Sequence, residues 1–148
     1  MIAFLIGLSS SLLTILLFTI FKKFDKRTVY GLILMGIGFL YIGYTWTDLP
    51  TAALSGAQAL FFMTLAYLGI MRSYWFLIAG YIMHGLWDFL YPVFANPDLL
   101  PPDYDYFCFT YDVVVGLYLL FYYFKRVRIS SKAAIVLPGK DEVHYKLT

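Results

Sequence analysis

Five long apolar segments, separated by short polar stretches, account for most of the chain. They are residues 2–21, 29–47, 52–71, 74–94 and 107–124. Each has about the 17–25 residues that an α-helix needs to cross ~30 Å of hydrocarbon. Lipid offers no partners to backbone N–H and C=O groups, and the segments are too long for barrel strands, so they must be helical. The pattern predicts an all-α integral membrane protein, a bundle of five transmembrane helices.

Composition supports this prediction. The 148 residues are 61% hydrophobic and only 14% charged, with a mean hydropathy of +0.75. A soluble domain is nearer half apolar and a quarter charged. One cysteine, Cys108, excludes an internal disulfide, and no phosphate-binding loop, dinucleotide motif or Cys/His cluster occurs. Nothing in the sequence supports nucleic-acid binding.

The basic residues predict the orientation of the bundle. With five spans, all 11 Lys and Arg fall on one side, in the stretches 22–28, 72–73 and 125–148. The other side carries only acidic residues, at Asp48, Asp98, Asp103 and Asp105. The positive-inside rule makes the basic side cytoplasmic. We therefore expect the N-terminus outside and the C-terminus in the cytoplasm.

Two further features of the chain ends follow. The first apolar segment lacks a basic leader and an Ala-x-Ala site, so we interpret it as a retained span rather than a signal peptide. We expect residues 1–128 to form the transmembrane domain and residues 129–148 a polar cytoplasmic tail, mostly extended or disordered. Within the tail, residues 133–137 are predicted to form a short strand or a surface turn.

Three ionisable residues lie inside the predicted spans: His84, Asp88 and Asp112. Such residues cost ~2.5–3.5 kcal/mol at the bilayer centre on insertion scales, which makes them functional candidates. His84 and Asp88 are one helical turn apart on the same face. By helix rise, Asp88 and Asp112 lie about 9 Å and 8 Å below the outer surface. The two carboxylates are therefore level, and we predict that the three residues form a catalytic group.

Other polar and aromatic residues follow a three- and four-residue rhythm on the spans, which is typical of faces packed against neighbouring helices. Glycines allow close helix approach in the cytoplasmic half. The polar members gather in the outer half and predict an outward-opening pocket. Its expected lining for a substrate is Tyr41, Thr45, Gln58, Tyr81, Trp87, Tyr91 and Tyr111.

Each of these assignments has a structural alternative. Asp88 could simply accept a hydrogen bond that stabilises the bundle, and Gln58 could hydrogen-bond a neighbouring helix. One imidazole and two carboxylates could also form a facial metal triad. The second histidine, His144, is in the tail, so we predict neither a metal nor a cofactor.

The segment from His84 through Trp87 and Asp88, followed by Cys108 and Asp112, resembles an uncharacterised family of small bacterial integral membrane proteins. Its members share a His-x-x-Trp-Asp helix and a later Cys-x-x-x-Asp helix. The resemblance covers roughly residues 80–120. It implies a bacterial inner (plasma) membrane but no particular reaction. In size and span number the chain is also similar to the translocator-protein family, although the tryptophan-rich motifs of that family are missing.

The leading functional hypothesis is a pocket for a hydrophobic small molecule, such as an isoprenoid, a sterol-like compound or a lipid. Asp112 or Asp88 would act as general acid, and His84 as base or as the group that orients the acid. Isomerisation or cyclisation would need no cofactor, and the aromatic rings could stabilise a cationic intermediate.

Two alternatives stay open. One is a proton- or cation-coupled small transporter, because intramembrane Asp and His residues are typical of proton relays. The other is an accessory subunit of a larger complex. The expected partners are membrane lipids and, in one version, a second copy of the chain as a homodimer. The small residues that could form such an interface are Gly7, Ser11, Gly31, Gly36, Gly38 and Gly43.

Overall fold

The computed structural model describes residues 1–136, with side chains described as far as residue 129. Within this part of the chain all regular structure is helical, as the sequence predicts. The helices are α1 (Ile2–Ile20), α2 (Lys26–Thr45), α3 (Leu49–Met71), α4 (Tyr74–Phe94), a short 3-10 helix η1 (Pro97–Leu99), and α5 (Tyr104–Val136).

Four of these helices, α1, α2, α3 and α5, are long and apolar enough to cross a membrane. Helix α4 has 21 residues and so matches the others in length. Its hydropathy is lower because it carries His84 and Asp88 inside the apolar segment. Four of the five predicted segments are thus helices that are long and apolar enough to span a membrane, and the fifth span stays a prediction.

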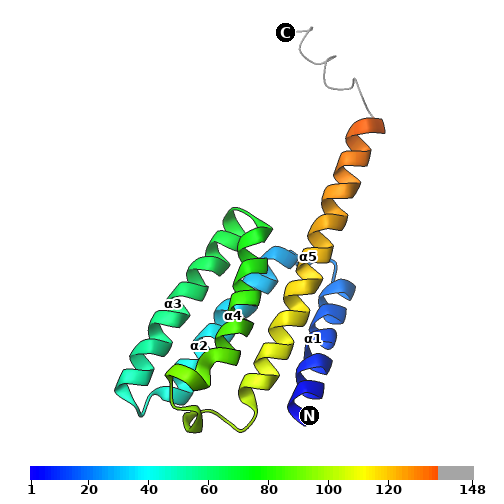
Figure 1. Ribbon diagram of the computed structural model, residues 1–148. Helices are drawn as coiled ribbons and strands as arrows, with labels where there is room; N and C mark the ends of the chain where they lie inside the picture. Colours follow the sequence, from blue (N-terminus) through cyan, green and yellow to red (C-terminus); the bar gives the residue numbers. More distant parts are fainter. Residues whose placement is uncertain (137–148) are drawn as a thin grey trace.

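The helices lie side by side in alternating directions (Figure 1). Helix α1 packs against α5, α5 against α4, and α4 against α3 and α2. The α1–α2 and α3–α4 connections lie at one end of the bundle. The N-terminus and the α2–α3 and α4–α5 connections lie at the other.

Polar caps set where the central helices begin. The Asp25 carboxylate accepts from the Thr28 backbone N–H at 2.9 Å, and Asp48 accepts from that of Thr51 at 3.1 Å. Ser73 caps α4 through the N–H of Trp75 at 3.4 Å. Each cap satisfies one backbone donor that the first helical turn leaves unpaired. The short polar connections therefore supply the residues that cap the start of the next helix.

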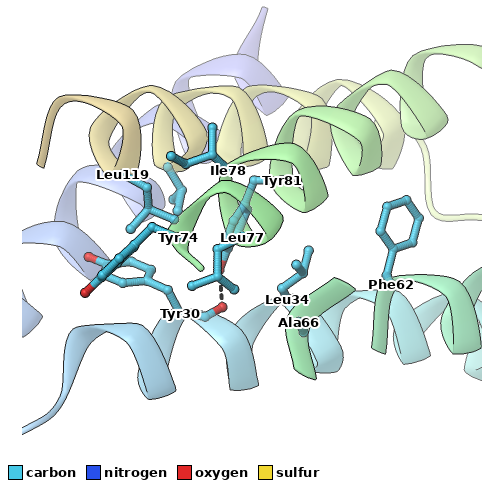
Figure 2. Close-up of a cluster of buried hydrophobic side chains, with 10 residues drawn as sticks. Tyr30, Leu34, Phe62, Ala66, Tyr74, Leu77, Ile78, Tyr81 and Leu119 are labelled. Carbon is cyan, nitrogen blue, oxygen red and sulfur yellow. Dashed lines mark hydrogen bonds between the residues drawn. The ribbon is translucent and has the colours of Figure 1, made fainter. Parts of the chain in front are cut away.

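A buried cluster of aliphatic and aromatic side chains fills the half of the bundle nearest the α1–α2 connection (Figure 2). Tyr81 lies in this cluster, fully buried, and donates a hydrogen bond to the backbone carbonyl of Tyr30 at 2.8 Å. Glycines let the helices approach closely here: a Cβ on Gly69 would come within 2.5 Å of the Leu77 side chain. The close packing in this half of the bundle fixes the helices relative to one another, and the same helices carry the residues of the other half.

Helix α5 is much longer than a span requires. It has 33 residues, whereas about 20 cross a bilayer, and its last turns project past the bundle in Figure 1. The predicted extended or disordered tail is wrong for residues 129–136, and so is the strand or turn proposed for 133–136. Those residues continue the helix because no proline or glycine interrupts them. Residue 137 and the rest of the predicted tail lie outside the described residues.

Most of the small residues considered for a partner interface are used inside the bundle. A Cβ on Gly7 would lie 2.5 Å from the Phe107 carbonyl oxygen, so Gly7 brings α1 against α5. Gly31 and Gly38 likewise face side chains of α3. Ser11 is also buried. Gly36 and Gly43 have open space around them, so the predicted six-residue interface reduces to these two positions.

Candidate functional site

The imidazole of His84 lies between two carboxylates. Its Nδ1 is 2.8 Å from Asp112 Oδ2 and 3.2 Å from Asp88 Oδ2. All three residues have 0% exposure. We call these three residues the charged cluster. The structure therefore brings together the three ionisable residues that the sequence analysis singled out within the predicted spans.

Local helix geometry explains the arrangement. His84 and Asp88 are four residues apart on α4 and therefore project from the same face. Asp112 comes from α5, which packs against α4 at Gly85. A Cβ on Gly85 would lie 3.4 Å from the Asp112 Cβ, which is an ordinary van der Waals contact. The packing of α5 on α4 beside His84 thus brings the second carboxylate to the imidazole.

A third helix completes the charged cluster. Tyr41 of α2 is fully buried, and its hydroxyl donates to Asp88 Oδ1 at 2.5 Å. The sequence suggested Tyr41 as a substrate contact, whereas the structure places its hydroxyl on a carboxylate. The tyrosine ring lies 5.0 Å from that of Tyr91 and 5.9 Å from that of Tyr104. The charged cluster and its hydrogen bond from Tyr41 therefore connect α2, α4 and α5.

Some polar atoms of the charged cluster share a hydrogen-bond partner, and others have none in the part of the chain that the structure describes. Two carboxylates share one ring nitrogen, which carries at most one proton. Asp112 Oδ1 and His84 Nε2 are buried and have no hydrogen-bond partner within the described residues. Groups arranged in this way can exchange a proton among themselves and can pass one on to a bound molecule.

The same three side chains are the ones that could hold a metal. One nitrogen and two carboxylate donors lie within 4.8 Å of one another. Such N/O donor sets suit first-row divalent ions. The distances from Nδ1 to the two oxygens are those of hydrogen bonds, so a shared proton already accounts for the arrangement.

A separate groove runs between α3 and α4 and has a volume of about 380 Å³. We call it the α3–α4 groove. Volumes of this size are typical of small-molecule sites. Its walls are almost wholly apolar, with two exceptions, Gln58 and Trp87. The lining consists of Leu54, Ala57, Gln58, Phe61, Phe62, Met83, Leu86, Trp87, Leu90 and Phe94.

Both polar groups of the α3–α4 groove lack partners. The amide nitrogen and oxygen of Gln58 make no hydrogen bond among the described residues, although the side chain is only 5% exposed. The indole N–H of Trp87 is buried and equally unpaired. A buried polar group without a partner costs about 1–3 kcal/mol. Gln58 is therefore not the interhelical hydrogen-bonder considered from the sequence.

Phe62 separates the α3–α4 groove from the charged cluster. Its ring lies 4.6 Å from the His84 ring, and the same side chain lines the groove. None of His84, Asp88 and Asp112 lines the groove itself. The predicted single pocket is thus divided into a charged interior and an apolar groove, with one aromatic ring between them.

The remaining predicted lining residues lie elsewhere. Thr45 donates within the bundle, to the Tyr41 carbonyl at 2.9 Å and to Ser55 Oγ at 3.1 Å. Tyr81 belongs to the buried cluster of Figure 2. Tyr111 donates to Thr14 Oγ1 of α1 at 3.2 Å. Tyr81 and Tyr111 are therefore not brought to the α3–α4 groove.

The ring of Tyr91 packs beside that of Tyr41. Tyr91 also lines a cavity of about 480 Å³ next to the α4–α5 connection. Tyr104 has a buried hydroxyl and packs on Tyr41 and Tyr44. Phe62 and Tyr104 are the site residues that the sequence did not identify. Phe62 is four residues after Gln58 and therefore lies on the same face of α3. Because it is apolar, the sequence alone does not mark it as part of a site.

One comparison with known proteins found a match. A family model described as a family of unknown function, DUF6010, matches residues 2–125. The match includes α2, α4 and the first part of α5, which carry Tyr41 and the charged cluster. It extends well beyond residues 80–120, to which the resemblance seen in the sequence was limited. No curated protein and no solved structure matches the chain.

Proposed function

Because the chain belongs to the DUF6010 family, whose function is unknown, we propose a function from the site itself. The protein binds a hydrophobic small molecule in the α3–α4 groove and uses the charged cluster for acid/base chemistry on it. The observation that carries this proposal is the unpaired amide of Gln58 in an otherwise apolar groove. That amide supplies a donor and an acceptor for one polar group of a ligand.

The shape and chemistry of the groove define the ligand class. Apolar walls favour an extended or fused-ring hydrocarbon, such as an isoprenoid, a sterol-like compound or a lipid tail. Gln58 and Trp87 would bind a hydroxyl, carbonyl or carboxyl group at one end. Sites of this composition, mostly apolar with a few placed polar groups, are typical for small ligands. Burying an unpaired amide is costly, so the ligand would recover part of that cost on binding.

The chemistry proposed for the charged cluster is proton transfer. His84 would take a proton from one carbon of the ligand, and Asp112, through its unpaired oxygen, would return one to another. Tyr41 would hold Asp88 in place as the second carboxylate. Rotation of Phe62 would bring a ligand from the groove to the imidazole. An isomerisation of this kind consumes no other reactant.

The orientation in the membrane is part of the proposal. With α4 as the fifth span, the basic residues of the α1–α2 and α3–α4 connections and of α5 would face the cytoplasm. The N-terminus would then lie outside a bacterial plasma membrane. His84, Asp88 and Gln58 would fall in the outer half of the bundle, and the groove would open sideways into the outer leaflet.

A second candidate function is proton- or cation-coupled transport. Its support is the enclosure of the charged cluster: α4 and α5 contribute its residues, Tyr41 of α2 hydrogen-bonds Asp88, all three ionisable side chains are fully buried, and the groove does not reach them. Buried Asp and His chains of this kind serve as proton relays in membrane carriers.

Two assays on the purified protein distinguish these candidates. In the first, candidate isoprenoids and sterol-like compounds are incubated with wild-type protein, His84→Ala and Asp112→Asn. Enzymatic function requires turnover that both variants lose while ligand binding persists; turnover unchanged in both variants would contradict it. In the second, ion flux into liposomes is compared with that of Asp88→Asn/Asp112→Asn. Flux that persists in this variant would exclude the relay.

A further inference from the structure

Another cavity lies at the end of the bundle that carries the α1–α2 connection, opposite the α2–α3 and α4–α5 connections. It has a volume of about 920 Å³, and residues of the α1–α2 connection and of the second half of α5 line it. We call it the basic cavity. Among the side chains that the structure describes, five cationic ones line it: Lys22, Lys23, Lys26, Lys125 and Arg126. The proposed function above makes no use of this cavity.

The charge of the basic cavity is almost unopposed. Asp25 is the one acidic residue that the described part of the chain contributes to its lining. Its carboxylate already accepts from the backbone N–H and the hydroxyl of Thr28, at 2.9 and 2.7 Å. Five positive charges therefore face one engaged carboxylate. Like charges held together in this way repel one another unless an anion lies between them.

The cations differ in how firmly they are held. Lys26 Nζ donates to the Tyr118 hydroxyl at 2.8 Å and lies 4.8 Å from the centre of the Tyr122 ring. Lys22, Lys23 and Lys125 have no hydrogen-bond or ion-pair partner among the side chains that the structure describes. One ammonium is thus fixed on the aromatic wall, and three long side chains can close over a ligand.

The cavity also has apolar surfaces of its own. Phe121, Phe24 and Ile129 line it and are 68%, 56% and 59% exposed. It lies where the apolar parts of α1 and α5 end, which is the level of the lipid headgroups when these helices cross a bilayer. A small soluble anion would leave these apolar side chains uncovered, whereas a lipid would cover them with its acyl chains.

We propose that the basic cavity binds the phosphate headgroup of an anionic phospholipid. The lysines and Arg126 hold the phosphodiester and the second anionic or polar group of the head, and the acyl chains run along Phe121 towards the hydrocarbon. Clusters of four or more basic residues beside membrane helices bind anionic lipid headgroups in this manner. The proposal does not depend on the function of the charged cluster.

The test measures lipid binding to the full chain in detergent by native mass spectrometry. The probes are phosphatidylglycerol, phosphatidylcholine and inorganic phosphate. The variant is Lys23→Gln/Lys125→Gln, which removes two charges from the cavity. The matched control, Arg72→Gln/Arg128→Gln, removes two charges outside its lining. A third protein, Lys23→Arg/Lys125→Arg, keeps the charge and reports any effect of substitution on folding.

Wild-type protein is expected to bind phosphatidylglycerol at least tenfold more tightly than phosphatidylcholine. The cavity variant should lose about tenfold or more of that affinity, at roughly 1 kcal/mol for each basic residue. The control and the arginine variant should stay within about threefold of wild type. Equal binding of the two lipids would overturn the proposal, and so would equal losses in the cavity variant and the control. Inorganic phosphate that displaces the lipid at micromolar concentration would assign the site to a free anion instead.

Discussion

The ring of Phe62 lies 4.6 Å from the ring of His84, and Phe62 is the contact between the α3–α4 groove and the charged cluster. One side of this phenylalanine faces an apolar space large enough for a small molecule. The other faces an imidazole held by two carboxylates. This relationship connects the two halves of the proposed site, and the predictions below test each half separately.

Gln58→Leu should stabilise the ligand-free protein and abolish ligand affinity. The substitution removes two unpaired polar atoms from a buried position, which we expect to raise the free energy of unfolding by about 1–2 kcal/mol. Opposite effects on stability and binding are typical of a binding residue. Thermal unfolding in detergent gives the first effect, and ligand titration gives the second. Leu90→Met, in the same groove, serves as the control and should leave both unchanged. A less stable Gln58→Leu protein would show that the amide has a structural partner.

His84→Leu should destabilise the protein by about 3 kcal/mol or more. It leaves the buried carboxylates of Asp88 and Asp112 without the imidazole, and breaking a buried ion pair is strongly destabilising. Replacing Asp112 by Leu in the same chain removes one of the stranded carboxylates, so the double variant should be more stable than His84→Leu alone. Met83→Leu, on the exposed side of α4, is the control. Losses that simply add would mean that the two residues do not interact.

Gly7→Ala should lower the free energy of unfolding, whereas Gly43→Ala should leave it unchanged or raise it. A Cβ at Gly7 would lie 2.5 Å from a backbone oxygen of α5, so α1 must move away, at a cost of about 1–3 kcal/mol. A Cβ at Gly43 would meet no atom of the described residues within 4 Å, and alanine there should be neutral or should favour the helix by up to about 1 kcal/mol. Thermal unfolding of the two variants measures the difference. Equal effects would contradict the close contact of α1 with α5.

The cap at Asp25 gives a pH-dependent prediction. Hydrogen bonds from Thr28 hold the pKa of the Asp25 carboxyl below its ordinary value of 3.8. A lowered pKa in the folded protein means that the stabilisation is fully present above about pH 4 and is lost as the pH falls through the folded-state pKa. Asp25→Ala should therefore cost about 1 kcal/mol at pH 7, and this difference from wild type should shrink in acid.

Asp25→Asn is the control for that measurement, because asparagine also caps a helix but does not titrate. Unfolding of the three proteins is followed from pH 7 to pH 3. A difference between wild type and Asp25→Ala that stays constant over this range would show that the ionised carboxylate contributes nothing.

The helices could be predicted largely from the sequence because their apolar segments are long and their connections short. For the helix that carries His84, the predicted and observed ranges agree, at 74–94. The end of α5 could not be predicted, since the polar residues after Ile129 continue a helix that the hydropathy pattern has already ended. Loss of hydropathy marks the membrane boundary and not the end of a helix.

The proximity of Asp88 and Asp112 to His84 followed from helix rise and from the four-residue spacing on α4. Their catalytic role stays a prediction. The directions of Tyr81 and Tyr111 could not be predicted, because both lie on interior faces and each has more than one neighbouring helix. Tyr81 binds a carbonyl of α2, and Tyr111 binds Thr14 of α1. The role of Phe62 depends on the α3–α4 contact, which no single helix reveals.

The most direct test of the proposed function is mass spectrometry of the compounds that copurify with the protein from its native membrane. Wild-type protein, Gln58→Leu and Leu90→Met are extracted in mild detergent, and their bound compounds are compared with the bulk membrane lipid. We predict one hydrophobic compound with a polar end group, enriched in wild type and in Leu90→Met and depleted at least tenfold in Gln58→Leu. Bound compounds that match the bulk lipid in all three proteins would contradict a ligand site in the α3–α4 groove.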